Sequence, residues 1–186
     1  MSVLCDIASK WGTDKATTLI ARVPMEVSGH GYTPYYHELF ADKRESVKKV
    51  LEIGIDVGRS LFMWQEYFPN ALIIGLDADP GRLIDGGRIR SMLCDQGDLE
   101  SLRRVKDSVG LGFDLILDDG SHDPIHQILT AKMLVPLLGP KGIYIIEDVM
   151  DPGKVTPYIP YRSEVKEFDV VRDPNSKLIV IFAGRL

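Results

Sequence analysis

The stretch Val50–Gly58 constrains the fold of this chain more than any other part of the sequence. Its first half is mostly aliphatic, and its second half contains Gly54 and Gly58. The aliphatic half predicts a buried strand, and the two glycines predict a tight turn into a helix over residues 60–68. Their spacing, Gly-x-x-x-Gly, differs from the Gly-x-Gly-x-x-Gly pattern that seats a dinucleotide pyrophosphate, which makes a nicotinamide-dependent oxidoreductase an unfavoured alternative.

Acidic residues accompany the first two aliphatic runs. Glu52 lies two residues before Gly54, and its charge would repel a pyrophosphate there, so a cofactor with a cationic end fits better. The next aliphatic run, residues 71–76, ends in Asp77, where a carboxylate accepts hydrogen bonds from a ribose diol. An ordinary βαβ turn would carry the same glycines, and the placement of Asp77 argues against that simpler interpretation.

These two stretches resemble the class I S-adenosylmethionine (SAM) dependent methyltransferases. The resemblance rests on Glu52, Gly54 and Gly58 in the first motif and on Asp77 in the second. It implies that SAM is the cofactor and that it binds at the carboxyl ends of the strands of an open α/β sheet.

The composition predicts a single soluble domain over residues 1–186, with an N-terminal part at 1–47 and an α/β core at 48–186. A net charge of -5 argues against a nucleic-acid partner, and no apolar run is long enough for a membrane span. Residues 1–10 lack the apolar core of a signal peptide. Cys5 and Cys94 are far apart in the chain, so we expect reduced thiols in a cytoplasmic protein.

From residue 48 onward, aliphatic runs alternate with amphipathic segments, which predicts a Rossmann-like doubly wound sheet with mostly parallel strands. Asp98 and Asp123 are each expected to cap the helix that follows them. The expected strands are 49–54, 71–76, 89–94, 113–118 and 142–147, and the expected helices are 60–68, 80–87, 98–108 and 123–137.

The two ends of the chain have other patterns. Residues 1–21 predict a short amphipathic helix and 35–47 a second helix, and we expect this part to form a helical lid over the core. At the other end, the runs 168–172 and 177–182 flank a turn-forming tetrapeptide, which predicts an antiparallel hairpin.

Polar residues follow the third, fourth and fifth expected strands. Asp95 is placed to meet an adenine amino group, and Gln96 to pack beside the ring. Asp118 and Asp119 follow the fourth strand, and the pair Glu147-Asp148 follows the fifth. Carboxylates gathered at adjacent strand ends repel one another unless a cation neutralises them.

Mg²⁺ prefers carboxylate oxygens, so we expect Asp119, Glu147 and Asp148 to be metal ligands. His122, three residues after Asp119, then has the chemistry of a general base for a hydroxyl group. His126 lies four residues after His122, but the pair lacks the His-Glu-x-x-His pattern of a zinc site, and His126 is expected to be a packed or supporting residue.

The segments Asp119–His122 and Glu147-Asp148, with the Trp11–Lys15 stretch, resemble a narrower group: the metal-dependent sugar O-methyltransferases of macrolide pathways, of the mycinamicin and tylosin type. The resemblance covers roughly residues 8–150. It implies Mg²⁺ as metal, His122 as catalytic base, and a glycoside as acceptor. The implied SAM-binding residues are Glu52, Gly54, Gly58, Asp77, Asp95, Gln96 and Asp118, with Thr13 and Lys15 near the methionine carboxylate.

The expected function is therefore Mg²⁺-dependent methyl transfer from SAM to a hydroxyl of a sugar or glycoside. Methylation of a catechol-like molecule and a SAM-binding domain without turnover remain alternatives. The chain departs from the family after Asp148, where only residues 149–163 lead to the hairpin. This shorter connection implies an acceptor pocket that is more open or that a second subunit of a homo-oligomer completes.

Overall fold

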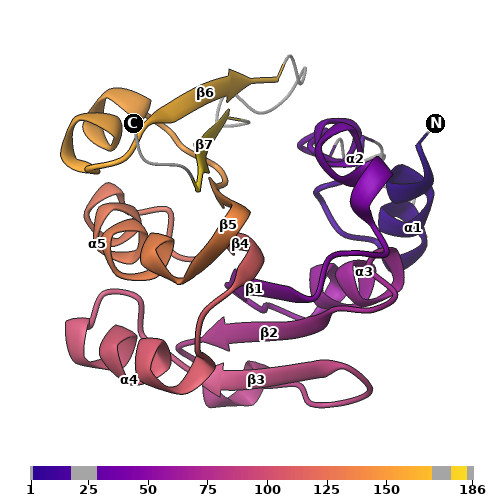
Figure 1. Cartoon of the computed structure of the whole chain (residues 1–186), viewed down its shortest axis with the longest axis horizontal. Helices are drawn as coiled ribbons and strands as arrows, with labels where there is room; N and C mark the ends of the chain where they lie inside the picture. The colour runs from indigo at the N-terminus through magenta and orange to yellow at the C-terminus, as the bar shows by residue number, and fades with distance from the viewer. Residues whose placement is uncertain (1, 18–28, 169–176, 184–186) are drawn as a thin grey trace.

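A computed structural model describes residues 2–17, 29–168 and 177–183, and its strands form one mixed sheet in the order β3-β2-β1-β4-β5-β7-β6 (Figure 1). The first five strands are parallel, and β7 is antiparallel to both of its neighbours. The strand order reverses between β1 and β4, which is where open α/β sheets bind ligands. The strands are β1 Lys49–Ile53, β2 Leu72–Asp77, β3 Ile89–Leu93, β4 Phe113–Asp118, β5 Leu138–Ile146, β6 Ser163–Glu167 and β7 Lys177–Phe182.

Helices cover both faces of the sheet (Figure 1). Side chains alternate across each strand, so Val50 packs with α1, α2 and α3, whereas Leu51 packs with α4 and α5. This two-sided burial confirms the expected doubly wound α/β fold. The α-helices are α1 Val3–Trp11, α2 Thr33–Phe40, α3 Arg59–Tyr67, α4 Leu99–Val109 and α5 Pro124–Leu134.

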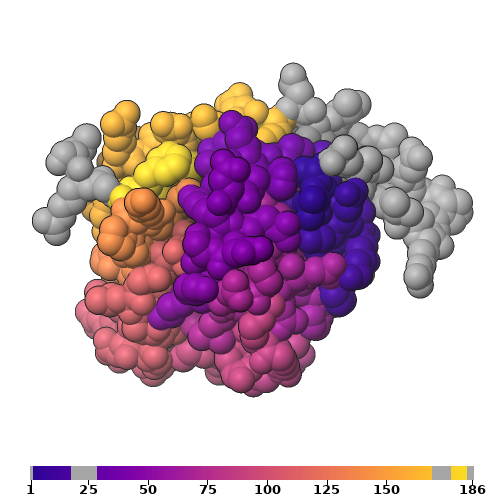
Figure 2. Space-filling model, turned by 45° about the vertical axis from the view of Figure 1, so that its right-hand side comes forward, coloured from indigo at the N-terminus to yellow at the C-terminus, as the bar shows by residue number. Residues whose placement is uncertain are grey.

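The expected helical lid is not confirmed. Leu4 of α1 and Tyr36 and Phe40 of α2 are fully buried in the same core cluster as Trp64 of α3. Figure 2 shows the indigo and purple residues of this part lying directly against the rest of the molecule. The two helices are thus a packed layer of the protein, joined to the core by a continuous apolar contact.

One expected helix is wrong. Residues 80–87 form a single 3₁₀ turn, η2 Pro80–Arg82, and then an irregular crossover to β3. The Asp85 carboxylate accepts a hydrogen bond from the Ser91 backbone at 2.9 Å, and Gly86 pairs with Ile89. Three of these eight residues are glycines, and each glycine lowers the stability of a helix, so the segment does not form the expected one.

The structure describes an antiparallel hairpin of β6 with β7, whose second strand matches the expected 177–182, while residues 169–172 of the expected first strand lie outside the described residues. The sequence of β6 is mostly polar and it lies at the sheet edge, so it carries little hydrophobic signal. The expected turn at 173–176 lies outside the described residues. The connection before β6 contains the short 3₁₀ turns η4 Pro152–Lys154 and η5 Thr156–Tyr158.

The expected helix caps are confirmed. The Asp98 carboxylate accepts from two backbone amides of the first turn of α4, and Asp123 accepts from the Ile125 amide of α5. Cys5 and Cys94 are buried free thiols. Within the described ranges, every helix is too short or too polar to cross a membrane.

Candidate cofactor and metal site

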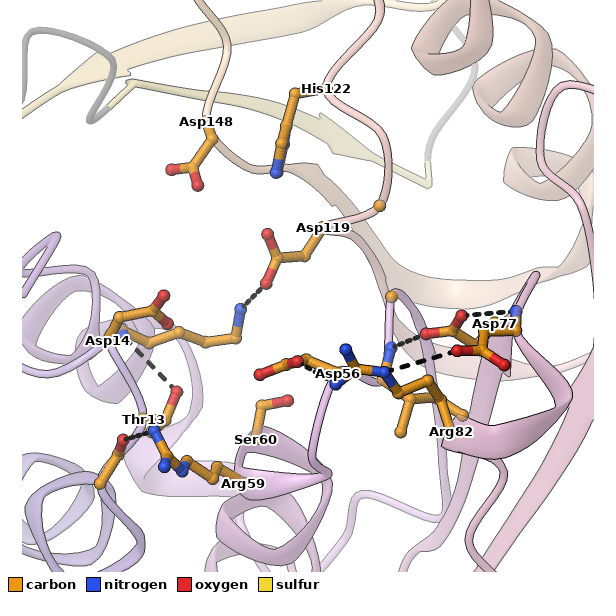
Figure 3. A pocket seen from close by; sticks show the side chains of 16 residues that line it. Thr13, Asp14, Asp56, Arg59, Ser60, Asp77, Arg82, Asp119, His122 and Asp148 are labelled. Atoms are coloured by element: carbon orange, nitrogen blue, oxygen red, sulfur yellow. Dashed lines mark hydrogen bonds and ion pairs between the residues drawn. The ribbon is translucent and has the colours of Figure 1, made fainter.

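Two adjoining pockets lie at the carboxyl ends of β1, β2 and β4. The large pocket has a volume of about 660 Å³ and the small pocket about 250 Å³, and both are lined by Gly54, Asp77 and Gly120. The large pocket is also lined by residues 12–15 and by Ile55, Asp56, Arg59, Ser60, Asp79, Arg82, Asp119, His122 and Asp148 (Figure 3). The small pocket is also lined by Ile53, Leu76, Ala78, Cys94, Asp95, Gln96, Ser121 and His126.

The two glycines of the first motif have different structural roles. Gly54 has φ +92°, and a Cβ atom there would lie 2.0 Å from the backbone oxygen of Asp119. Gly54 therefore allows the ends of β1 and β4 to pass closely beneath the pockets. Gly58 has φ +79° and is the N-cap of α3, where an added Cβ would meet Ile84 at 2.4 Å. Gly58 shapes the turn, and in the described part of the chain it lines neither pocket.

Asp77 lies at the junction of the two pockets. One carboxylate oxygen accepts from the Ile55 backbone amide at 2.9 Å, and the other accepts from the Asp79 amide at 2.9 Å. These bonds hold the carboxylate in one orientation, and each oxygen keeps a second lone pair for another donor. The geometry suits recognition of two neighbouring hydroxyl groups.

The small pocket is lined by Asp95 and Gln96 and also by His126, whose Nδ1 lies 2.8 Å from the Ser121 hydroxyl oxygen. The Gln96 amide is occupied inside the protein, because it donates to Asp118 at 2.8 Å and accepts from the Ser121 backbone at 2.6 Å. Gln96 therefore holds the end of β4 while its side chain lines the pocket.

Asp118, which was expected in the cofactor site, lines neither of the two pockets. It is 1% exposed, and its carboxylate accepts hydrogen bonds from Gln96 and from the Tyr144 hydroxyl at 3.1 Å. Burial raises the pKa of Asp118 to about 6, against the lowering effect of these two donors. Asp118 is a structural acid beneath the site.

Three expected site residues converge at one end of the large pocket (Figure 3). Asp119, His122 and Asp148 each offer one ligand atom, and these atoms lie within 4.8 Å of one another. Asp119 follows β4, His122 lies in the loop before α5, and Asp148 follows β5. Adjacent parallel strands β4 and β5 thus bring together residues that are up to 29 positions apart in the sequence.

Backbone strain marks the same pocket. Among the described residues, the non-glycine positions with positive φ are Asp56 at 49°, His122 at 58° and Asp148 at 52°, and all three line the large pocket. Such conformations cost roughly 1–3 kcal/mol each and are retained mainly at functional sites. The strain therefore points to a binding or catalytic role for this pocket.

Among the described residues, Glu147 lies outside this group of three, but it shares the Lys15 ammonium with Asp119. Its carboxylate accepts from the Lys15 ammonium at 2.6 Å and from the Tyr36 hydroxyl at 2.6 Å. The Lys15 ammonium also contacts Asp119 and lies 3.4 Å from Glu52. Glu52 is fully buried and does not line the pocket itself, but it interacts with two residues that do, Lys15 and Ser60.

Burial dominates the ionisation of this acidic cluster. It raises the pKa values of Glu147 and Asp119 above their usual range and that of Glu52 to about 7, while Lys15 lowers all three. Burial also disfavours the charged form of Lys15, but Asp119, Glu147 and Glu52 together raise its pKa well above the ordinary value. Lys15 is therefore a cation at neutral pH.

Sequence reasoning placed Thr13 and Lys15 near the site, and both line the large pocket. It missed the tyrosines as partners of the acids: the Tyr32 hydroxyl donates to Asp148 at 2.5 Å, as Tyr36 does to Glu147. It also missed six other residues of the large pocket. Ser60 could have been found from its position two residues after Gly58 of the first motif. The six residues are Asp14, Asp56, Arg59, Ser60, Asp79 and Arg82.

The chain is similar in sequence to antibiotic sugar O-methyltransferases. It is 39% identical over 127 residues to the mycinamicin VI 2''-O-methyltransferase of Micromonospora griseorubida, covering 64% of this chain and 32% of that protein. It is 39% identical over 127 residues, with the same coverage, to the 8-demethyl-8-(2-methoxy-alpha-L-rhamnosyl)-tetracenomycin-C 3'-O-methyltransferase of Streptomyces olivaceus. The chain thus spans about a third of the length of these curated relatives, and it matches no protein-family model.

Solved structures agree with the sequence comparison. The MycE methyltransferase from the mycinamycin biosynthetic pathway, in complex with Mg and SAH, has a TM-score of 0.73 and 27% identity, covering 99% of this chain and 55% of that one. The SAH-bound Podospora anserina methyltransferase PaMTH1 has a TM-score of 0.58 and 18% identity, covering 97% and 88%, and supports the fold alone. The chain therefore has the class I methyltransferase fold, and its curated homologues are sugar O-methyltransferases of the mycinamicin and tetracenomycin type.

Proposed function

We propose that this chain transfers the methyl group of SAM to a hydroxyl of a sugar or glycoside, with a divalent cation bound beside the acceptor. The observation that carries the proposal is the large pocket. It has the ribose-type acid Asp77 at one side and the group Asp119, His122 and Asp148 at the other, and two of these three residues have a positive φ. MycE, which has the same fold, was solved with Mg, SAH and mycinamycin VI.

The two pockets fit the parts of SAM. Asp77 lies where both pockets meet and suits the ribose, and Asp95 in the small pocket suits the adenine amino group. The methionine end then extends into the large pocket, toward Thr13, Lys15 and Asp14. This part offers cationic and anionic side chains, which match the carboxylate and ammonium groups of that end.

The residues present also fit a divalent cation. Asp119 and Asp148 offer carboxylate oxygens, which Mg²⁺ prefers, and the two carboxylates would repel each other without a cation between them. Glu147 stays a prediction as third ligand, because its carboxylate is bonded to Lys15 and Tyr36 in this structure. A cation held here would lower the pKa of an acceptor hydroxyl and orient it toward the methyl group.

We assign the proton transfer to His122. Its Nδ1 is buried and has no hydrogen-bond partner among the described residues, so the ring is not committed to a structural contact through that atom. His122 would accept the proton of the attacking hydroxyl as the new C–O bond forms and the C–S bond of SAM breaks. The transfer is one in-line displacement, so the protein needs no covalent nucleophile.

Calorimetry and a transfer assay test this function together. We expect SAH to bind in the micromolar range, about -8 kcal/mol, and Mg²⁺ to give a separate heat. Transfer from labelled SAM should then occur to glycosides and not to catechols, and should stop when EDTA removes the metal. Methylation of catechols alone would reassign the acceptor, and SAH binding without any transfer would favour a non-catalytic domain.

The Asp77→Asn variant should bind SAH roughly tenfold or more weakly, because it loses a charged acceptor for the ribose hydroxyls. Asp114→Asn is the matched control. Asp114 also accepts two backbone amide bonds, from Lys48 at 2.7 Å and Lys49 at 3.1 Å, but at the amino end of β4. Calorimetry should show normal SAH affinity for Asp114→Asn. Equal affinities of the two variants would remove Asp77 from the cofactor site.

A further inference from the structure

Lys15 is the buried counter-ion of three carboxylates. Its side chain is 1% exposed, and its ammonium lies 2.6 Å from Glu147 Oε2 and 3.4 Å from Glu52 Oε1 and contacts Asp119 Oδ2. Glu52 and Glu147 are as buried as the lysine. One cation inside the protein therefore balances a group of acids that would otherwise be costly to bury.

Asp119 belongs to two clusters at once. It contacts the Lys15 ammonium, and it also offers a ligand atom to the group with His122 and Asp148 at the end of the large pocket. Figure 3 shows the side chains of Asp119, His122 and Asp148 meeting at that end of the pocket. The internal ammonium and any cation bound by this group must therefore share the Asp119 carboxylate.

Glu147 is held in a similar way. Its Oε2 accepts from Lys15 and its Oε1 accepts from Tyr36, so both oxygens are engaged inside the protein. A divalent cation that uses Glu147 has to share this carboxylate with the ammonium, and the two positive charges repel each other at such short range. A cation that uses only Asp119 and Asp148 still experiences the repulsion of an ammonium that contacts Asp119, with little water between them to screen it.

We infer that the Lys15 ammonium and a divalent cation compete for Asp119 and Glu147. Lys15 neutralises these acids when the cation is absent, and its positive charge weakens the binding of the cation. The inference rests on the proposed function in that it takes the cation site at Asp119 and Asp148 as given. Lys15 is a positioning residue in this scheme: it acts on the cation through the carboxylates that both contact.

The test is a calorimetric titration of Mg²⁺ into the wild type and the Lys15→Met variant. Methionine keeps the length of the side chain and removes the charge, and we expect Mg²⁺ to bind on the order of tenfold more tightly, or about 1.4 kcal/mol. Lys10→Met is the matched control, because Lys10 pairs with Glu66 at an exposed site outside the pocket. Its Mg²⁺ affinity should equal that of the wild type.

A double variant guards against loss of folding. Lys15→Met with Glu52→Gln removes the ammonium and one buried carboxylate together, so the net charge stays that of the wild type. We expect it to melt cooperatively by circular dichroism and still to bind Mg²⁺ more tightly than the wild type. Equal or weaker binding by the folded variants would overturn the competition.

A parallel titration with SAH separates this inference from the proposed function. Normal SAH binding by the wild type and by Lys10→Met, with unchanged Mg²⁺ affinity in both Lys15 variants, overturns the inference and leaves the methyltransferase proposal in place. Tighter Mg²⁺ binding by the variants, with no SAH binding by any protein, supports the competition and overturns the methyltransferase proposal. Absence of Mg²⁺ binding in every protein overturns the competition together with the metal role.

Discussion

A His122→Asn variant is expected to lose methyl transfer by a factor of roughly 10² to 10⁴, the contribution of a positioned general base, while it keeps its affinity for SAH. Asparagine is the informative substitution because the backbone at His122 has φ 58°, a conformation that asparagine adopts readily. The variant therefore removes the imidazole without adding backbone strain. Its amide cannot accept a proton from a hydroxyl at neutral pH.

The measurement is the initial rate of transfer from labelled SAM, with SAH affinity determined by calorimetry on the same preparation. His37→Gln is the matched control, since His37 of α2 contacts the Tyr67 hydroxyl of α3 at 2.8 Å and neither residue lines the large pocket. It should keep the wild-type rate. A normal rate in His122→Asn would exclude His122 as the base, and a parallel loss of SAH affinity would indicate a binding role instead.

The Gly54→Ala variant is expected to lose roughly 4 kcal/mol or more of the free energy of unfolding, a large fraction of the stability of an ordinary domain. The added Cβ would lie 2.0 Å from the Asp119 oxygen and 2.8 Å from the Asp119 carbonyl carbon. Both are backbone atoms of the neighbouring strand end, so relief of the clash has to move Asp119 itself. The positive φ of +92° adds strain for any side chain.

Gly112→Ala separates the clash from the strain. Gly112 has φ +86°, close to that of Gly54, but a Cβ there would meet nothing within 4 Å. Its loss of stability should be only about 1–2 kcal/mol, the strain of the backbone conformation. Urea unfolding of both variants measures the difference. Similar losses of unfolding free energy in the two variants would show that Asp119 can move away from an added Cβ at Gly54, so that the contact between the ends of β1 and β4 is not tight.

The sequence alone determined the elements whose signal is local. Strand β1, the glycine turn and α3 were predicted within one or two residues, because aliphatic runs, glycines at fixed spacing and helix caps depend on neighbours in the chain. The same holds for the positions of polar residues at strand ends, which is why Asp77, Asp119, His122 and Asp148 were all predicted, and all line the large pocket.

Elements with a weak local signal were predicted less well. The crossover at 80–87 has apolar residues at helical spacing, but its glycines and its contacts to β3 override them. The edge strand β6 is polar because one side of it has no neighbouring strand to pack against, and its position depends on pairing with β7.

Only the tertiary structure decided the partners of the buried charges. Lys15 is separated by 104 residues from Asp119 and by 132 from Glu147, and no local pattern joins them. Likewise, Asp118 and Asp119 are adjacent in the sequence, yet the pleat of β4 turns Asp118 toward Gln96 and Tyr144 and leaves Asp119 at the pocket. The sequence shows which acids follow the strands, and the packing of the sheet determines which of them line the large pocket and which are buried beneath it.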